Sequence, residues 1–425
     1  MAIKETAELA GSIRRAVALR ERDIRELTAR LVAIPTENPP GRRYKECARI
    51  LVEELRRLEL PAELVRVPRP GGQETRYCVL SSLGSGRCTL YFHGHYDVVP
   101  AGSPKQFHPT VVNGVLRGRG SADMKGGLAA MIHAMAVLKE LRVPLNGKIA
   151  LALVPDEETG GAGGSRYLLK SGRLGRNGIG MFTPEPTSGV IWNACRGAIS
   201  MRVTVRGKPA HVGLHYRGVN AFERAVQLAH ALTALGRRVA RRHTQFPIAP
   251  AAARRSVLLI GGEVAGGTNF NVVPQECSFT IDRRINPEES LAKEKLAILA
   301  VLDQFRRRGY VIEHEILQQE PSAGCSEHES VAQELARSAQ EITGRTPRFE
   351  LCPGLLEIRF YAQRGVPAYA FGPGRLEVAH GPNECVTLKK VYEFTAIYAL
   401  AAARILTAAA GVTPCSRASQ IIDNA

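Results

Sequence analysis

The fold is most readily inferred from the segment Cys88-Thr89-Leu90-Tyr91-Phe92-His93-Gly94-His95-Tyr96-Asp97. Its apolar first half predicts a buried strand, and the polar residues that follow predict the carboxyl end of that strand. Alternation along a strand places His93, His95 and Asp97 on one face, so that an imidazole and a carboxylate can act together. A second apolar segment, Lys148–Val154, also runs into polar residues. Functional sites in α/β folds gather where such strands end.

Segments on both sides alternate between helix and strand patterns. An amphipathic helix is predicted over the first forty residues, ending where Pro39, Pro40 and Gly41 forbid its continuation. Further helices are predicted over 45–58 and 126–141, and strands over 62–67 and 77–81. This alternation predicts an α/β domain whose mostly parallel sheet is flanked by helices.

The pattern changes near Gly197. Residues 198–317 have the order strand, helix, strand, strand, helix, strand, which predicts an α+β domain of ferredoxin-like order. After Pro321 the α/β pattern resumes, with a helix over 330–341, a strand over 367–371 and a closing helix over 388–406. We therefore expect one discontinuous catalytic domain, residues 1–197 and 318–425, with residues 198–317 inserted into it.

The bulk composition is that of a globular protein. The 425 residues are 44% hydrophobic and 23% charged, which excludes a disordered or collagen-like chain. Lys and Arg number 57 against 40 Asp and Glu, a net charge of +17. These bases are spread along the chain without an aromatic-interleaved basic motif, so we expect no nucleic-acid partner. A positive field would instead favour small anionic substrates.

Nine cysteines are scattered without a CxxC spacing, which predicts reduced thiols in a cytoplasmic protein. The N-terminal segment mixes acids and bases and lacks the apolar core of a signal peptide. Charges, glycines or prolines interrupt the apolar runs, so we expect no membrane segment.

Several candidate metal ligands lie at turns. His95 could bind a cation while Asp97 holds its other ring nitrogen, although a capped strand end with surface histidines fits this segment equally well. Asp123 lies in a glycine-rich loop that fits neither the dinucleotide fingerprint nor the P-loop. It could cap the following helix or, paired with His95, bridge two cations.

The strand ending at Val154 is followed by three successive carboxylates, Asp156, Glu157 and Glu158. They would repel one another in a poorly solvated site unless a cation compensates. One glutamate could then bind metal while its neighbour takes a proton from water, although exposed acidic runs are common. Glu185, between two prolines, and His380 complete the set. Such mixed nitrogen and oxygen ligands suit zinc, cobalt or manganese.

Together these segments resemble the cocatalytic zinc metallopeptidase family that includes aminoacylase, acetylornithine deacetylase, succinyl-diaminopimelate desuccinylase and carboxypeptidase G. The resemblance runs from about Leu31 to beyond Glu384, with five motifs in the family's order. It implies two zinc ions, with cobalt or manganese as alternatives. It also implies a role for each candidate residue: His95 and Glu185 on one ion, Glu158 and His380 on the other, Asp123 bridging, Asp97 orienting His95, and Glu157 as general base.

The inserted domain resembles the family's lid, through which two subunits dimerise. His211, in Gly207-Lys208-Pro209-Ala210-His211, would then stabilise the oxyanion of the tetrahedral intermediate. Asn271 and Arg284 would bind the substrate's carboxylate. Without the resemblance, Asn271 is as readily a turn residue and Arg284 a surface base. A homodimer is implied by the resemblance alone.

One segment departs from the family pattern. Leu355 and Leu356 stand where many relatives have small hydroxyl residues, which predicts a more apolar substrate pocket. We expect a metal-dependent hydrolase of the C–N bond of a small carboxylate-bearing substrate, such as an N-acyl amino acid or a dipeptide. One alternative is hydrolytic deamination of an aromatic or other activated amine. Another is an enzyme of the amidohydrolase type, whose first sequence motif is an HxH pair after a strand, here His93 and His95. The third is a non-catalytic binding protein.

Overall fold

The computed structural model describes residues 3–68 and 75–408, and the chain divides into two compact units. Among the described residues, the first contains the chain up to Asn193, Cys325–Phe349 and Phe360–Ala408; the second contains Ala194–Gly324 and Glu350–Arg359. The sequence placed these boundaries at 197/198 and 317/318. It also assigned residues 350–359, which include Leu355 and Leu356, to the catalytic domain, whereas the structure groups them with the inserted unit.

The sheet of the first unit has parallel strands at its centre. Along its length the strands follow the order β1-β2-β6-β3-β7-β15-β8. β3 pairs in parallel with β6 and β7, and β7 with β15, whereas the pairs β1–β2, β2–β6 and β15–β8 are antiparallel. The parallel pairing predicted from the sequence is therefore confined to the middle of a mixed sheet. Its strands are β1 (Glu63–Val67), β2 (Arg76–Gly84), β3 (Thr89–His95), β6 (Lys148–Val154), β7 (Gly178–Thr183), β8 (Ile191–Cys195) and β15 (Ala368–Ala370).

Helices cover this sheet. The sequence predicted one N-terminal helix, but the structure has two, because the backbone leaves helical geometry at Arg20. Ile13 and Val17 before the break and Ile24 and Leu27 after it are all buried. The helices are α1 (Ile3–Leu19), α2 (Glu21–Val32), α3 (Tyr44–Arg57), α4 (Gly126–Glu140), α5 (Ser165–Lys170), α8 (Ser330–Thr343), α9 (Ile358–Ala362) and α10 (Leu388–Ala408).

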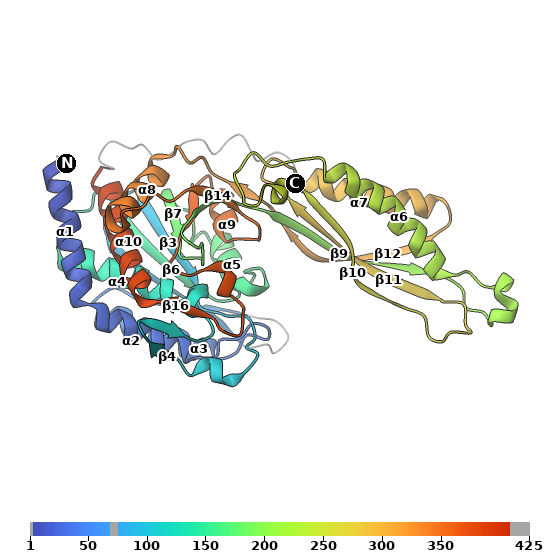
Figure 1. Cartoon of the computed structure of the whole chain (residues 1–425), viewed down its shortest axis with the longest axis horizontal. Helices are drawn as coiled ribbons and strands as arrows, with labels where there is room; N and C mark the ends of the chain where they lie inside the picture. The colour runs from blue at the N-terminus through green and yellow to red at the C-terminus, as the bar shows by residue number, and fades with distance from the viewer. Residues whose placement is uncertain (1–2, 69–74, 409–425) are drawn as a thin grey trace. The chain divides into compact units, whose positions relative to one another are not determined.

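The centre of the first core is formed by α4 and α10, which pack against each other beside the sheet (Figure 1). α10 is long and apolar enough to cross a membrane by length and composition, although 72% of its most apolar window is buried inside the fold. That burial is typical of a core helix. A small separate sheet of the order β16-β5-β4 lies beyond the main one, with β4 (Thr110–Val112), β5 (Val115–Arg117) and β16 (Cys385–Thr387).

The second unit has the ferredoxin-like order predicted from the sequence. Its antiparallel sheet runs β10-β11-β9-β12, and α6 and α7 lie on one face of it (Figure 1). Alternation along β9 and β11 buries one face of each strand against these helices. The elements are β9 (Gly197–Arg206), α6 (Ala221–Val239), β10 (Val257–Gly266), β11 (Glu276–Ile285), α7 (Leu291–Arg307) and β12 (Val311–Glu320). The short strands β13 (Ala323–Gly324) and β14 (Phe349–Cys352) fall where the chain divides between the units.

Candidate metal centre

The carboxyl ends of three parallel strands bring most of the predicted ligands together. His95 is the last residue of β3 and pairs in register with Val154, the last residue of β6. Glu157 and Glu158 follow β6, and Glu185 follows β7 on the other side of β3. Since parallel strands end at the same edge of a sheet, segments distant in sequence deliver their side chains to one place.

Asp123 lies between the two histidines. Its Oδ1 atom is 3.2 Å from Nε2 of His95, and its Oδ2 atom is 3.2 Å from Nε2 of His380. Nε2 of His380 is also 3.4 Å from Oε2 of Glu158. The side chain of Asp123 does not cap α4, whose first turn has no side-chain cap. One carboxylate thus offers one oxygen to each side of the site, as a bridging ligand must.

These residues form two overlapping groups that could each hold a cation. His95, Asp123 and Glu185 make one group, and Asp123, Glu158 and His380 make the other, with ligand atoms in each group within 4.8 Å of one another. The grouping matches the division that the resemblance implied. The assigned roles themselves stay predictions.

The donor set fits a divalent cation. Two imidazoles and three carboxylates are the mixed nitrogen and oxygen ligands that zinc, cobalt and manganese accept. Oε1 of Glu158 is buried and has no hydrogen-bond partner in the described part of the chain, a costly arrangement unless a cation binds it. Burial raises the pKa of Glu158.

Electrostatics within the site tie the imidazoles to the carboxylates. Hydrogen bonds to Asp123 and Glu158 raise the pKa of His380 to about 10. Burial by itself would raise the pKa of Asp123, but hydrogen bonds from His380 and His95 outweigh it and hold that pKa below its ordinary value. The centre therefore binds positive charge strongly, and a divalent cation would compete with the histidines' protons for the same carboxylate oxygens.

Asp97 differs in detail from the sequence prediction. Nδ1 of His95 is 3.0 Å from the main-chain oxygen of Asp97 and 3.5 Å from its carboxylate Oδ1. The buried carboxylate instead accepts the backbone N–H groups of Glu157 and Glu158, each at 3.2 Å. Asp97 thus orients His95 mainly through its backbone, while its side chain positions the turn that carries both glutamates.

The remaining predicted residues belong to the second unit. His211 is exposed, and its Nδ1 accepts the N–H of Gly213 at 3.1 Å, so the ring hydrogen lies on Nε2. Asn271 lies on a neighbouring segment, where its main-chain oxygen accepts the N–H of Val212. Arg284 forms an ion pair of 2.6 Å with Asp282. Leu355 is half-buried, and Leu356 is 4% exposed and belongs to the core.

Sequence reasoning missed three residues at this site. Asn38 donates to Oδ2 of Asp97 at 2.8 Å, while Arg119 and Glu384 form a buried ion pair that contacts the backbone of two candidate ligands. Glu384 stands four residues after His380 and Arg119 four before Asp123, but this spacing does not reveal that they pair.

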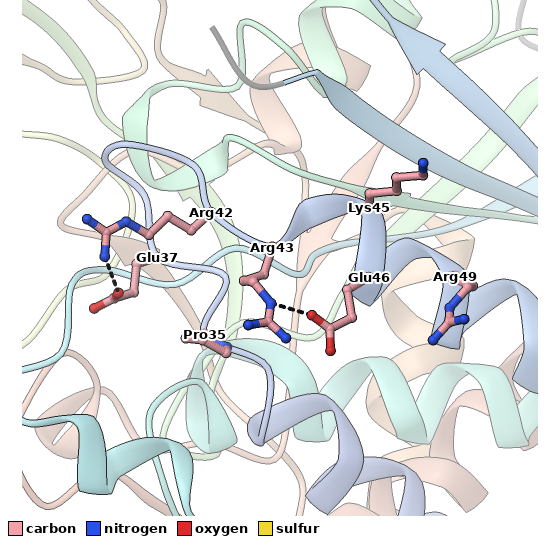
Figure 2. Close-up of a pocket in the computed structure, with 7 residues that line it drawn as sticks. All are labelled: Pro35, Glu37, Arg42, Arg43, Lys45, Glu46 and Arg49. Atoms are coloured by element: carbon pink, nitrogen blue, oxygen red, sulfur yellow. Dashed lines mark hydrogen bonds and ion pairs between the residues drawn. The ribbon is translucent and has the colours of Figure 1, made fainter.

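A separate shallow cavity of about 720 Å³ lies at the start of α3 (Figure 2). Four of its charged side chains pair with one another: Arg42 lies 3.9 Å from Glu37, and Arg43 binds Glu46. None of the candidate metal ligands lines this cavity. We therefore assign the chemistry to the strand ends and not to this cavity.

Comparison with known proteins agrees with this geometry. Residues 91–404 match Peptidase family M20/M25/M40. The chain belongs to this family. It is 26% identical over 401 residues to N-formyl-4-amino-5-aminomethyl-2-methylpyrimidine deformylase of Halalkalibacterium halodurans, covering 87% of this chain and 91% of the relative. M20/M25/M40 membership makes the protein a metal-dependent hydrolase of amide bonds.

Two solved structures share the fold of this M20/M25/M40 chain. The M20 metallo-carboxypeptidase Sso-CP2 of Sulfolobus solfataricus has a TM-score of 0.75 at 17% identity, covering 89% of this chain and 98% of that one. The dinuclear metal-binding peptidase YXEP of Bacillus subtilis has a TM-score of 0.65 at 17% identity, covering 92% and 99%.

Proposed function

We propose that this hydrolase removes an acyl group from a small N-acylated substrate, with Glu157 as the general base. The observation that carries the proposal is the pair of ligand groups sharing Asp123 at the strand ends, beside a second glutamate that belongs to neither group. Bound cations, which we propose are two zinc ions, would lower the pKa of water and polarise the carbonyl group of the substrate. In this proposal the chain's own residues supply the ligands, the base and the hydrogen bonds that position the base.

Glu157 is held next to the ligand Glu158 by its main chain. The carboxylate of Asp97 accepts both backbone N–H groups, which fixes the turn while leaving the Glu157 side chain outside both ligand groups. A carboxylate so placed can take a proton from the attacking water and deliver it to the leaving amine. His211, with its hydrogen on Nε2, is suited to donate to a developing oxyanion.

Glu157→Gln tests the assignment of the base. The amide keeps the shape of the side chain but cannot accept the proton, so we expect kcat to fall by about 10²- to 10⁴-fold while metal content is unchanged. Metal analysis and steady-state kinetics of the same preparation measure both quantities. Glu140→Gln, on the exposed end of α4, is the matched control and should keep full activity. An active Glu157→Gln enzyme would contradict the proposal.

The substrate class is proposed on two grounds. The net charge of +17 favours an anionic substrate such as an N-acyl amino acid or a dipeptide. A second candidate is an N-acylated aromatic amine, since the relative from Halalkalibacterium halodurans acts on an N-formylated aminopyrimidine. Release of free amine from a panel of N-acetyl amino acids, dipeptides and N-formyl aromatic amines separates the two, and a parallel ammonia assay detects deamination.

Leu355 is the residue we propose for substrate preference. It is half-buried, whereas Leu356 is buried in the core and its replacement would disturb folding. We expect Leu355→Ser to lower kcat/KM for apolar acyl substrates about tenfold relative to polar ones, because one apolar contact contributes about 1–3 kcal/mol of discrimination. An unchanged ratio of kcat/KM between apolar and polar substrates would show that Leu355 does not contact the substrate.

We also propose a cytoplasmic homodimer formed through the second unit. The nine cysteines are scattered along the sequence without a CxxC spacing, which supports a reducing compartment. β10 is an edge strand, and Phe270 and Val264 nearby are 97% and 65% exposed, which supports pairing with a second copy. Sedimentation analysis should give twice the chain mass for the native protein and the chain mass for Phe270→Asp. A monomeric native protein would contradict the dimer.

A further inference from the structure

A buried ion pair beside the metal centre has no part in the mechanism described so far. Arg119 and Glu384 are 3% and 2% exposed, and Nη1 of Arg119 lies 2.6 Å from Oε2 of Glu384. They are 265 residues apart in sequence. The antiparallel pair β5–β16 brings them together, since Arg119 follows the end of β5 and Glu384 precedes the start of β16.

Both members of the pair hold the backbone of candidate ligands. Oε1 of Glu384 accepts the N–H of Ala122 at 3.0 Å and the N–H of Asp123 at 3.1 Å. Nη2 of Arg119 donates to the main-chain oxygen of His380 at 3.0 Å. One ion pair therefore connects the loop of the bridging aspartate to the loop of the histidine that faces it.

Folding alone does not explain these charges. Removing two charges from water is costly, and apolar side chains of similar volume often serve stability as well as a buried ion pair. Nε of Arg119 also has no hydrogen-bond partner within the described residues, so the burial is not fully compensated. What an apolar pair could not supply is the set of three hydrogen bonds to the backbone at Ala122, Asp123 and His380.

We propose that Arg119 and Glu384 are positioning residues that set the distance between Asp123 and His380 and thereby the affinity for the second cation. This inference rests on the proposed ligand set. His380 belongs only to the group with Glu158, whereas the first cation would be held by His95 and Glu185 as well as Asp123. Loss of the pair should therefore weaken the second cation more than the first.

Calorimetric titration of the metal-free protein with Zn²⁺ tests the inference. In Arg119→Met we expect the affinity of the second ion to fall about 10- to 100-fold, as for other residues that hold metal ligands, while the first ion binds nearly as in the native protein. Arg119→Lys keeps the charge but cannot reproduce the planar fork, so we expect a smaller loss at the same ion. If Arg119→Met does not fold, the affinities of Arg119→Lys for the two ions test the inference instead.

Arg404→Met is the matched control. Arg404 is also a largely buried arginine of the first unit, with ion pairs to Glu334 at 3.2 Å and Glu341 at 2.6 Å, but it touches no candidate ligand. We expect its removal to lower the melting temperature and leave both metal affinities unchanged. The visible spectrum of Co²⁺-loaded protein gives a second readout, because a displaced ligand alters the geometry around the second ion.

Two results would overturn the inference. Native affinity for both ions in the Arg119 variants would mean that the pair serves folding alone, and an equal loss at both ions would remove the specific link to His380. His380→Ala separates this failure from that of the ligand set: if it binds two ions with native affinity, His380 is not a ligand, and the inference falls with the assignment.

Discussion

Asn38 illustrates how much a single buried amide contributes to the metal centre. Its Nδ2 donates to Asp97 at 2.8 Å and to Thr159 at 2.9 Å, and it lies 3.3 Å from Asp156. Its backbone N–H is bonded to the carbonyl of Val98, which fixes the loop against the end of β3. Asn38 therefore links the segment that follows His95 to the turn that carries both glutamates.

The candidate ligands can be singled out in the sequence one by one, but the residues that hold them cannot. His95 ends an apolar strand and Glu158 follows one, and both patterns are visible in sequence, whereas Glu185 was singled out by the prolines on either side of it. Asn38 and Arg119 act on residues 59 and 265 positions away, where local pattern carries no information. The use of the main-chain oxygen of Asp97 was also invisible, since sequence reports side chains and not backbone direction.

His133 provides a residue-scale prediction about acid stability. It is fully buried in α4 with no hydrogen-bond partner for either ring nitrogen in the described chain, and burial lowers its pKa to about 4. In the unfolded chain the imidazole of His133 takes up a proton near pH 6.5, whereas in the folded protein it stays neutral down to about pH 4. Protonation therefore favours the unfolded chain, and the free energy of unfolding falls as the pH falls from about 6.5 to 4. A shift of this size corresponds to about 3 kcal/mol.

Urea unfolding of the metal-free protein at pH 7 and pH 4 measures this loss. We expect His133→Leu to lose about 3 kcal/mol less than the native protein over this interval, because it has no imidazole to protonate. His328→Leu, at a side chain 83% exposed, is the control and should behave as the native protein does. An equal decrease in the free energy of unfolding in all three proteins would show that protonation of His133 does not cause the loss of stability at low pH.

At the scale of elements, the core strands and helices followed from periodicity, whereas several short strands did not. β6 was predicted with the bounds it has, and α4 to within one residue. β7 and β8 escaped because Gly178–Thr183 and Ile191–Cys195 are short and do not alternate. The N-terminal break at Arg20 escaped because the amphipathic pattern continues across it.

The glycine at the start of α4 gives an element-scale prediction. A Cβ at Gly127 would lie 2.3 Å from Cβ of Pro184, which precedes the ligand Glu185. Gly127→Ala should therefore displace the turn after β7 and weaken the first cation about tenfold or more, a cost of about 1.4 kcal/mol or more in binding. Zinc titration measures the change.

The matched control lies in α6. A Cβ at Gly236 would meet its nearest neighbour, the oxygen of Leu258, at 3.5 Å, which is ordinary contact. Gly236→Ala should stabilise the second unit by about 0.5–1 kcal/mol and leave zinc binding unchanged. Glycine-to-alanine substitution is thus expected to weaken zinc binding in α4 and to leave it unchanged in α6. Equal zinc affinity in the two variants would contradict the packing described at Pro184.

The whole molecule consists of two units with separate cores, and the candidate metal ligands all come from the first. We therefore expect calorimetry to resolve two unfolding transitions, of which a chelator lowers only one. Ions at a thousandfold excess over Kd would stabilise that unit by about 4 kcal/mol. Gly236→Ala identifies the other transition by raising it. A chelator that lowered both transitions equally would show that the units unfold together.

At this scale the sequence indicates an inserted domain, because the order of elements changes near Gly197. The assignment of residues 350–359 was not, since a short segment that returns to the inserted unit has no distinct composition. The segment follows α8 and contains all of β14 except its first residue, and sequence alone offered no reason to detach it from its neighbours.

Because α10 packs against α4, the first unit cannot bury its core until the ribosome has made α10. The inserted unit, by contrast, is almost entirely synthesised by Gly324 and has its own core. Domains fold as they emerge from the ribosome, so we expect the inserted unit to fold before the first unit. Until α10 is made, the apolar side chains of α4 that pack against it stay exposed to solvent. The interval before α10 emerges is then when this protein has the greatest need of a chaperone.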